Sequence, residues 1–132
     1  MLKKNDLISL EIQSVTSQGS GVGRHEGMAV FVPHAAPGDR LTARVVKVLP
    51  SYCYGIIQEI VEPGPGRTEP GCPVCRRCGG CSLRHLDYPA ELAEKERWVA
   101  DAIARIGGLS VPVRPILPSP RAEGYRNKAQ YP

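Results

Sequence analysis

Four cysteines lie within the ten residues from Cys72 to Cys81, and this run constrains the chain more than any other stretch. It reads Cys-Pro-Val-Cys-Arg-Arg-Cys-Gly-Gly-Cys. Neighbouring residues of a loop cannot all point into one apolar core, so a group of thiols this dense indicates bound thiolates. The fifth cysteine, Cys53, stands alone between two tyrosines and is predicted to be a small buried residue of a strand.

Three kinds of thiolate site compete for this run. Zinc sites are usually built from two CxxC pairs with a spacer of roughly a dozen or more residues, whereas only Arg76 and Arg77 separate the pairs here. Disulfides suit a secreted chain, but the N-terminus lacks an apolar signal segment, so we expect a cytoplasmic protein with reduced thiols. Iron–sulfur ligands do occur in tight cysteine runs, and the two glycines allow backbone amides to approach the sulfurs. The spacing favours an iron–sulfur site.

The cysteine run and the residues that follow it resemble bacterial RNA (uracil-5-)-methyltransferases. The matching residues are Cys72-x5-Cys78-Gly79-Gly80-Cys81, then Ser82-Leu83-Arg84-His85-Leu86-Asp87-Tyr88, and later Tyr125-Arg126-Asn127-Lys128. The resemblance implies a [4Fe–4S] cluster held by Cys72, Cys78 and Cys81 together with a cysteine further along the chain, and leaves Cys75 as an additional thiol. It also implies methyl transfer from S-adenosylmethionine to C5 of a uridine, with ribosomal RNA as the expected partner.

The first sixty residues predict a mainly β, OB-like barrel over residues 1–62. Strands are expected at 7–15, 28–32, 41–49 and 52–61, mainly from alternation of apolar and polar residues, and the glycine-rich segment 17–25 is expected to form a turn or bulge. Four or five short strands favour a closed barrel, because a small open sheet leaves its edges exposed. This part is similar to the RNA-contacting TRAM module, on Gly19–Arg24, Val30–Pro33 and Pro37–Asp39.

Three further segments follow the barrel. Residues 63–70 are a linker rich in proline and glycine, and residues 71–108 comprise the cysteine loop and one amphipathic helix. Asp87 is expected to cap that helix and Gly107-Gly108 to end it, with Trp98 as a packing anchor. Its apolar stripe is Leu92, Val99, Ile103 and Ile106. Residues 109–132 are expected to be a proline-rich connector and the first strand, from Tyr125, of a truncated α/β region.

The charge distribution suits a polyanionic partner. Lysine and arginine number 17 against 13 acidic residues, for a formal net charge of +4, and the excess lies around the cysteines and in residues 105–128. The alternative is a solvated basic surface. No run of eighteen apolar residues occurs, so no membrane span is expected, and no obligate protein partner is inferred. The candidate RNA-binding residues are Arg24, Arg76, Arg77, Arg126 and Lys128.

The catalytic apparatus of the resembled family is not visible in these residues. No glycine-rich strand–loop–helix for S-adenosylmethionine occurs, and no cysteine follows Cys81. We therefore expect the RNA-engaging, iron–sulfur part of such an enzyme, inactive by itself. Two other classes stay open. One is a free-standing RNA-binding module whose four cysteines complete an iron–sulfur or zinc site, and the other is a small ferredoxin-like electron carrier.

Overall fold

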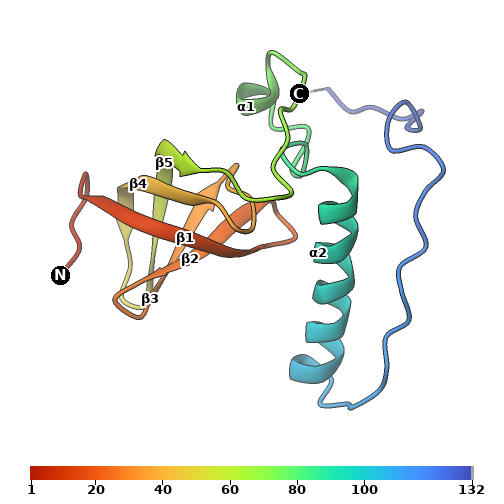
Figure 1. Ribbon diagram of the computed structural model, residues 1–132, viewed down its shortest axis with the longest axis horizontal. Coiled ribbons are helices and arrows are strands. Elements are labelled where there is room, and N and C mark those ends of the chain that lie inside the picture. The colour runs from red at the N-terminus through yellow and green to blue at the C-terminus, as the bar shows by residue number, and fades with distance from the viewer. Residues whose placement is uncertain (132) are drawn as a thin grey trace.

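The computed structural model describes residues 1–131, and its N-terminal half is a closed five-stranded barrel (Figure 1). The strands follow the order β1-β2-β3-β5-β4 around the barrel, with β3 and β5 parallel and the other pairs antiparallel. This arrangement confirms the predicted OB-like barrel. The strands are β1 (Leu7–Val15), β2 (Ser20–His25), β3 (Met28–Pro33), β4 (Arg40–Val48) and β5 (Tyr52–Glu62).

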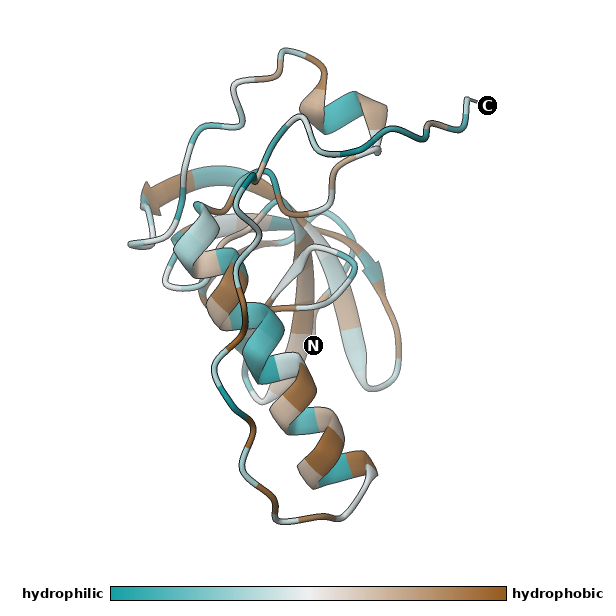
Figure 2. Cartoon of the chain, turned by 90° about the vertical axis from the view of Figure 1, so that its right-hand side faces the viewer, coloured by the Kyte–Doolittle hydropathy of each residue, from teal (hydrophilic) through white to brown (hydrophobic). Residues whose placement is uncertain are grey.

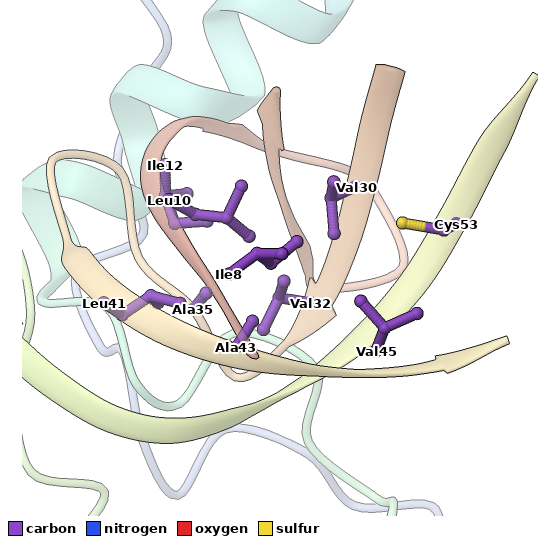
Figure 3. Packing of buried hydrophobic residues seen from close by; sticks show 10 residues of the cluster. All are labelled: Ile8, Leu10, Ile12, Val30, Val32, Ala35, Leu41, Ala43, Val45 and Cys53. Carbon is purple, nitrogen blue, oxygen red and sulfur yellow. The ribbon is translucent and has the colours of Figure 1, made fainter. Parts of the chain in front are cut away.

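Alternation along the strands builds the barrel core. In β1, Ile8, Leu10 and Ile12 are buried while the residues between them are exposed, as period-two pleating requires. Figure 3 shows these side chains gathered inside the barrel, with the Cys53 sulfur among them. Cys53 is fully buried, which confirms its predicted role as a small core residue. The core cluster is Ile8, Leu10, Ile12, Val30, Val32, Ala35, Leu41, Ala43, Val45 and Cys53.

The segment predicted as a glycine-rich turn is instead mostly strand β2. Its glycines allow close approach at the barrel wall. A Cβ at Gly21 would lie 2.6 Å from the Ala35 Cβ, and one at Gly23 would lie 3.0 Å from the Glu11 carbonyl oxygen. The prediction holds for the turn at Gly19, whose φ is +88°, and was wrong for Ser20–His25. Glycine inside a strand, used where another chain segment comes near, has the same sequence signature as glycine in a turn.

Two helices follow the barrel. Helix α1 (Cys75–Cys78) is one short turn inside the cysteine run, and α2 (Tyr88–Asp101) extends away from the barrel (Figure 1). The Asp87 side chain accepts a hydrogen bond from the Ala90 amide at 2.9 Å, which confirms the predicted cap. A π-helical turn, η1 (Ala102–Ile106), continues α2 and ends at Gly107.

The predicted apolar stripe on α2 is largely unburied within residues 1–131. Val99 is 50% exposed and Ile106 is 88% exposed. An extended segment, residues 109–131, returns beside the helix (Figures 1 and 2), and its Ile116 and Ser119 amides donate to Glu96 and to the Tyr88 hydroxyl.

The strand predicted from Tyr125 is absent from the described chain, where residues 109–131 contain no helix or strand. A strand needs a hydrogen-bonded partner, and no neighbouring strand is available to this segment among residues 1–131. No helix of the described chain is long and apolar enough to cross a bilayer.

The side chains of β1 and β4 differ sharply in their burial. Leu41 is 1% exposed inside the barrel and Leu7 is 61% exposed on β1, so the two give a matched pair of leucine-to-alanine changes. We expect Leu41→Ala to lower the free energy of unfolding by about 2–5 kcal/mol and Leu7→Ala by about 0.5 kcal/mol or less, measured by urea denaturation followed by circular dichroism. Equal losses would contradict the observed register of the strands.

Candidate functional site

A buried carboxylate joins the barrel to the segment that leads into the cysteines. Asp39, just before β4, is fully buried and accepts hydrogen bonds from the amides of Ala36 (2.7 Å) and Gly64 (2.8 Å). The Arg67 guanidinium donates to both carboxylate oxygens, from Nε at 3.0 and 3.1 Å and from Nη2 at 2.6 Å. A buried charge needs such pairing, so the residues predicted as a linker are fixed to the barrel.

The surroundings of Asp39 keep it ionised. Burial by itself would raise the pKa of this carboxyl, but the hydrogen bonds from Arg67, Gly64 and Ala36 outweigh that effect and lower the pKa below its ordinary value. Arg67 also donates to the His34 carbonyl oxygen at 2.6 Å. One ion pair therefore holds the loop after β3 and the loop after β5 together.

His85 is a second buried contact between the cysteine segment and the barrel. Its Nε2 lies 3.0 Å from the Ala35 carbonyl oxygen, so the neutral ring with a proton on Nε2 donates to that acceptor. Burial lowers the pKa of His85, and the Arg67 charge adds to this effect. The ring of His34 packs edge-on against it at a centroid distance of 6.2 Å.

Glycines bring the two parts into direct backbone contact. Gly19, at the β1–β2 turn, has φ +88°, and a Cβ there would lie 2.2 Å from the Ser82 carbonyl oxygen. A Cβ at Gly64 would lie 2.1 Å from the Pro37 carbonyl oxygen. Helix α2 adds a further contact, because the Trp98 Nε1 donates to the Val15 carbonyl oxygen at 2.7 Å, which confirms Trp98 as a packing anchor. The cysteine run is thus positioned on the barrel end formed by these loops.

Within the cysteine run, the four thiols differ in burial. Cys75 is buried at the start of α1, Cys72 is partly buried, and Cys78 and Cys81 are exposed. Gly79 ends α1 in the left-handed conformation (φ 71°), and Gly80 lies against the Cys78 sulfur, 3.3 Å from where a Cβ would stand. The glycines therefore leave space beside an exposed thiol, as a site for bound sulfur ligands requires.

The donor set fits an iron–sulfur cluster in its chemistry, since the run offers soft thiols and no carboxylate. In residues 1–131 no three Cys, His, Asp or Glu side chains are grouped as a metal site would need. The assignment of Cys72, Cys78 and Cys81 as ligands therefore stays a prediction.

The five predicted RNA-binding side chains lie on three separate elements. Arg76 and Arg77 are exposed on α1. Burial of His34 lowers its pKa, and the Arg76 charge lowers it further. Arg24 is exposed near the β2–β3 turn, where its Nη1 donates to the Gly27 carbonyl oxygen at 3.1 Å. Arg126 and Lys128 are exposed in the segment after η1. The structure places only the first two side by side.

Two features of this region were not predicted from the sequence. The Asp39–Arg67 pair joins residues 28 positions apart, and no local pattern marks such a pair. An aromatic cluster of Phe31, Tyr52 and Tyr54 lies on the outside of the barrel. Its sequence signal was available, because Tyr-x-Tyr around an inward-facing Cys53 places both tyrosines on the outer face.

The chain is similar to proteins of known families. Residues 4–57 match the TRAM domain profile. The whole chain is similar to curated proteins named uncharacterized RNA methyltransferase, at 44% identity over 98% of the chain for one from Synechocystis and 43% over 99% for one from Halalkalibacterium halodurans. The chain is related to RNA methyltransferases, and its barrel is a TRAM domain. It spans 28% and 29% of the lengths of these two relatives.

One solved structure similar to the chain is the Pyrococcus abyssi tRNA (uracil-54, C5)-methyltransferase in complex with S-adenosyl-L-homocysteine. It is 28% identical with a TM-score of 0.47, over 80% of this chain and 23% of that one. Another is a conserved protein of Methanococcus maripaludis, 22% identical with a TM-score of 0.42, over 44% of this chain and 83% of that one.

The buried ion pair gives a mutational prediction. Asp39→Asn keeps the shape of the side chain but leaves Arg67 without its counter-charge, so we expect a loss of about 3 kcal/mol in the free energy of unfolding. The matched control is Glu62→Gln, because the Arg40–Glu62 pair is exposed on both sides and should contribute less than about 1 kcal/mol. Denaturation followed by the fluorescence of Trp98 measures both, and similar losses in the two variants would contradict the account.

A pH prediction follows from the two buried groups. His85 has a folded pKa below its ordinary 6.5, so its contribution is complete above that value and declines as the pH falls below it. Asp39 has a folded pKa below 3.8, so its contribution is lost at still lower pH, as the pH falls through the folded value. The charged or titratable groups that act on His85 are Arg67, His34 and Asp39. We expect the free energy of unfolding to fall as the pH is lowered from 7 to 5, and to fall less steeply in His85→Gln than in the wild type. The same slope in the wild type and the variant would contradict this role of His85.

Proposed function

We propose that the chain is the RNA-engaging and iron–sulfur part of an RNA (uracil-5-)-methyltransferase. The parent enzyme would transfer a methyl group from S-adenosylmethionine to C5 of a uridine, in ribosomal RNA, in the cytoplasm. The observation that carries this proposal is the joint occurrence of a TRAM barrel and the Cys72-x5-Cys78-Gly-Gly-Cys81 run in one chain that is similar over its length to RNA methyltransferases.

Two parts of the chain would contact the RNA. The first is the TRAM barrel, and the second is the exposed arginine pair on α1, Arg76 and Arg77. Buried contacts through Asp39 and His85 fix the cysteine segment to the barrel, so that RNA bound to one part is held in a defined position relative to the other. The α2 surface carries Glu91, Glu96 and Asp101 and is unsuited to phosphate.

The cluster would be held by Cys72, Cys78 and Cys81. Cys78 and Cys81 are exposed, beside the two glycines, whereas the buried Cys75 is turned into the fold. We assign Cys75 a packing role, and the fourth ligand would come from elsewhere in the parent protein. Bound there, the cluster would supply a redox-capable or structural centre, and the residues of this chain would supply its thiolates and the nearby arginine charge.

Anaerobic reconstitution with iron and sulfide in the presence of dithiothreitol tests this ligand set. We expect Cys72→Ser, Cys78→Ser and Cys81→Ser each to reduce bound iron and visible absorption severalfold, because each removes a thiolate ligand. Cys75→Ser and Cys53→Ser are the controls and should keep the wild-type iron content. Loss of iron in Cys75→Ser as large as in Cys78→Ser would replace this assignment with a site made from all four cysteines of the run.

Salt dependence of RNA binding tests the arginine pair. Each phosphate neutralised by a side chain contributes about 0.7 to the slope of log affinity against log salt concentration for single strands. The double variant Arg76→Ala/Arg77→Ala should therefore reduce the magnitude of the slope by about 1.4, measured by fluorescence anisotropy with a labelled oligouridylate. Arg40→Ala is the matched control, because Arg40 is exposed but paired with Glu62. An unchanged slope in the double variant would exclude α1 from the RNA contact.

A further inference from the structure

Three aromatic rings form one cluster on the outer surface of the barrel. Phe31 comes from β3, and Tyr52 and Tyr54 come from β5. The ring centroids of Phe31 lie 5.6 Å from Tyr52 and 5.9 Å from Tyr54, and the two tyrosines are 5.6 Å apart. Such distances are those of packed aromatic pairs, so the rings support each other in one arrangement.

Strand register places the cluster in a continuous row. Val22 pairs with Phe31, Phe31 pairs with Tyr54, and Tyr54 pairs with Lys47. Paired residues of neighbouring strands point to the same face, so this row crosses β2, β3, β5 and β4 on the outside of the barrel. A second row beside it joins Arg24 to Ala29 and Ala29 to Tyr52.

This face is open to solvent. Tyr54 is 39% exposed and Ile56, two residues further along β5, is 37% exposed. The cysteine segment and α2 instead contact the barrel at the β1–β2 and β3–β4 loops and at the Val15 carbonyl oxygen. In Figure 1, α2 lies at the end of the barrel opposite the β2–β3 and β4–β5 turns.

Cations flank the rings on both sides. Lys47 is exposed opposite Tyr54, Arg44 lies three residues before it in β4 and pairs with Ile56, and Arg24 is exposed at the end of the second row. The neighbouring Tyr52 side chain raises the pKa of Tyr54 above its ordinary value, so its phenol is neutral at physiological pH. Glu26 lies in the β2–β3 turn and Glu59 lies opposite Thr42 of β4, so neither carboxylate belongs to the two rows.

We infer that the Phe31–Tyr52–Tyr54 cluster is a stacking platform for unpaired RNA bases, with Arg24, Arg44 and Lys47 contacting the flanking phosphates. One exposed ring, Tyr54, and two partly exposed rings between cations match a single strand, whose bases present flat π-faces and whose backbone carries regular negative charge. A duplex hides those faces, so the platform selects single-stranded RNA. This inference rests on the proposed RNA engagement and specifies where on the barrel it occurs.

The platform also lies within reach of the arginine pair on α1. Strand β3 runs from Phe31 towards His34, and the Arg76 charge acts on His34. Strand β3 ends at Pro33, two residues beyond Phe31, and two residues of extended chain span about 7 Å, a short distance for a few nucleotides of single-stranded RNA. A single strand stacked on the aromatic cluster can therefore continue along β3 towards the cysteine segment.

Substitution of the most exposed ring tests the platform in the full chain. The probe is a twelve-nucleotide oligouridylate, labelled for anisotropy, with a second version that carries one 2-aminopurine as a reporter of stacking. We expect Tyr54→Ala to weaken binding by roughly five- to a hundredfold and to reduce the quenching of 2-aminopurine, whereas Tyr54→Phe, which keeps the ring, should bind within about twofold of the wild type. Tyr131→Ala removes an exposed tyrosine elsewhere and is the matched control.

The possible outcomes separate this inference from the proposed function. If the wild type binds the oligouridylate but Tyr54→Ala binds equally well, RNA engagement stands and the platform is overturned, and the aromatic face would then suit a protein contact. If the wild type binds a twelve-base-pair duplex as tightly as the single strand, selection of unpaired bases is overturned. If the wild type binds no RNA, both the platform and the proposed function fail.

Discussion

The buried ion pair between Asp39 and Arg67 holds the cysteine segment in place on the barrel. It lies where the barrel, the segment after β5 and the approach to the cysteines meet, and the charge of Asp39 is balanced by Arg67 and two backbone amides. Without that balance a buried carboxylate is strongly unfavourable, so the three segments are ordered together. A stretch with the composition of a flexible linker becomes a fixed connection between a TRAM barrel and a cysteine run.

Glycines allow the backbone of the barrel loops to contact the backbone of the segments after β5. The β1–β2 turn touches the backbone beside Cys81 through Gly19, and the position of Gly64 permits contact with the loop before Asp39. The cysteine run is therefore presented from one end of the barrel, while the aromatic cluster of β3 and β5 occupies its outer wall. We propose that both regions contact one partner, a single strand of RNA.

Much of the barrel could be predicted because strand alternation is local: β1 has its predicted limits, and Cys53 is buried as expected. Strand β2 was not predicted because its glycines are required by close contacts with residues distant in the sequence. The Asp39–Arg67 pair was not predicted for the same reason, because its two residues are 28 positions apart in the sequence. The apolar stripe of α2 was predicted to be a packing face, but Val99 and Ile106 are exposed. Periodicity identifies an apolar face of a helix and does not say what covers that face. For the site, spacing identified the thiols, whereas their differing burial required the fold.

A map of the residues that respond to RNA tests whether the barrel wall and α1 bind one single strand. The ¹⁵N-labelled chain, titrated with single-stranded oligouridylate, would show by amide chemical-shift changes which surfaces respond. We expect changes on β2, β3 and β5 around Phe31 and Tyr54, and on α1 around Arg76, with α2 unaffected. Changes confined to α2 and residues 109–131, with none on the barrel, would contradict this expectation.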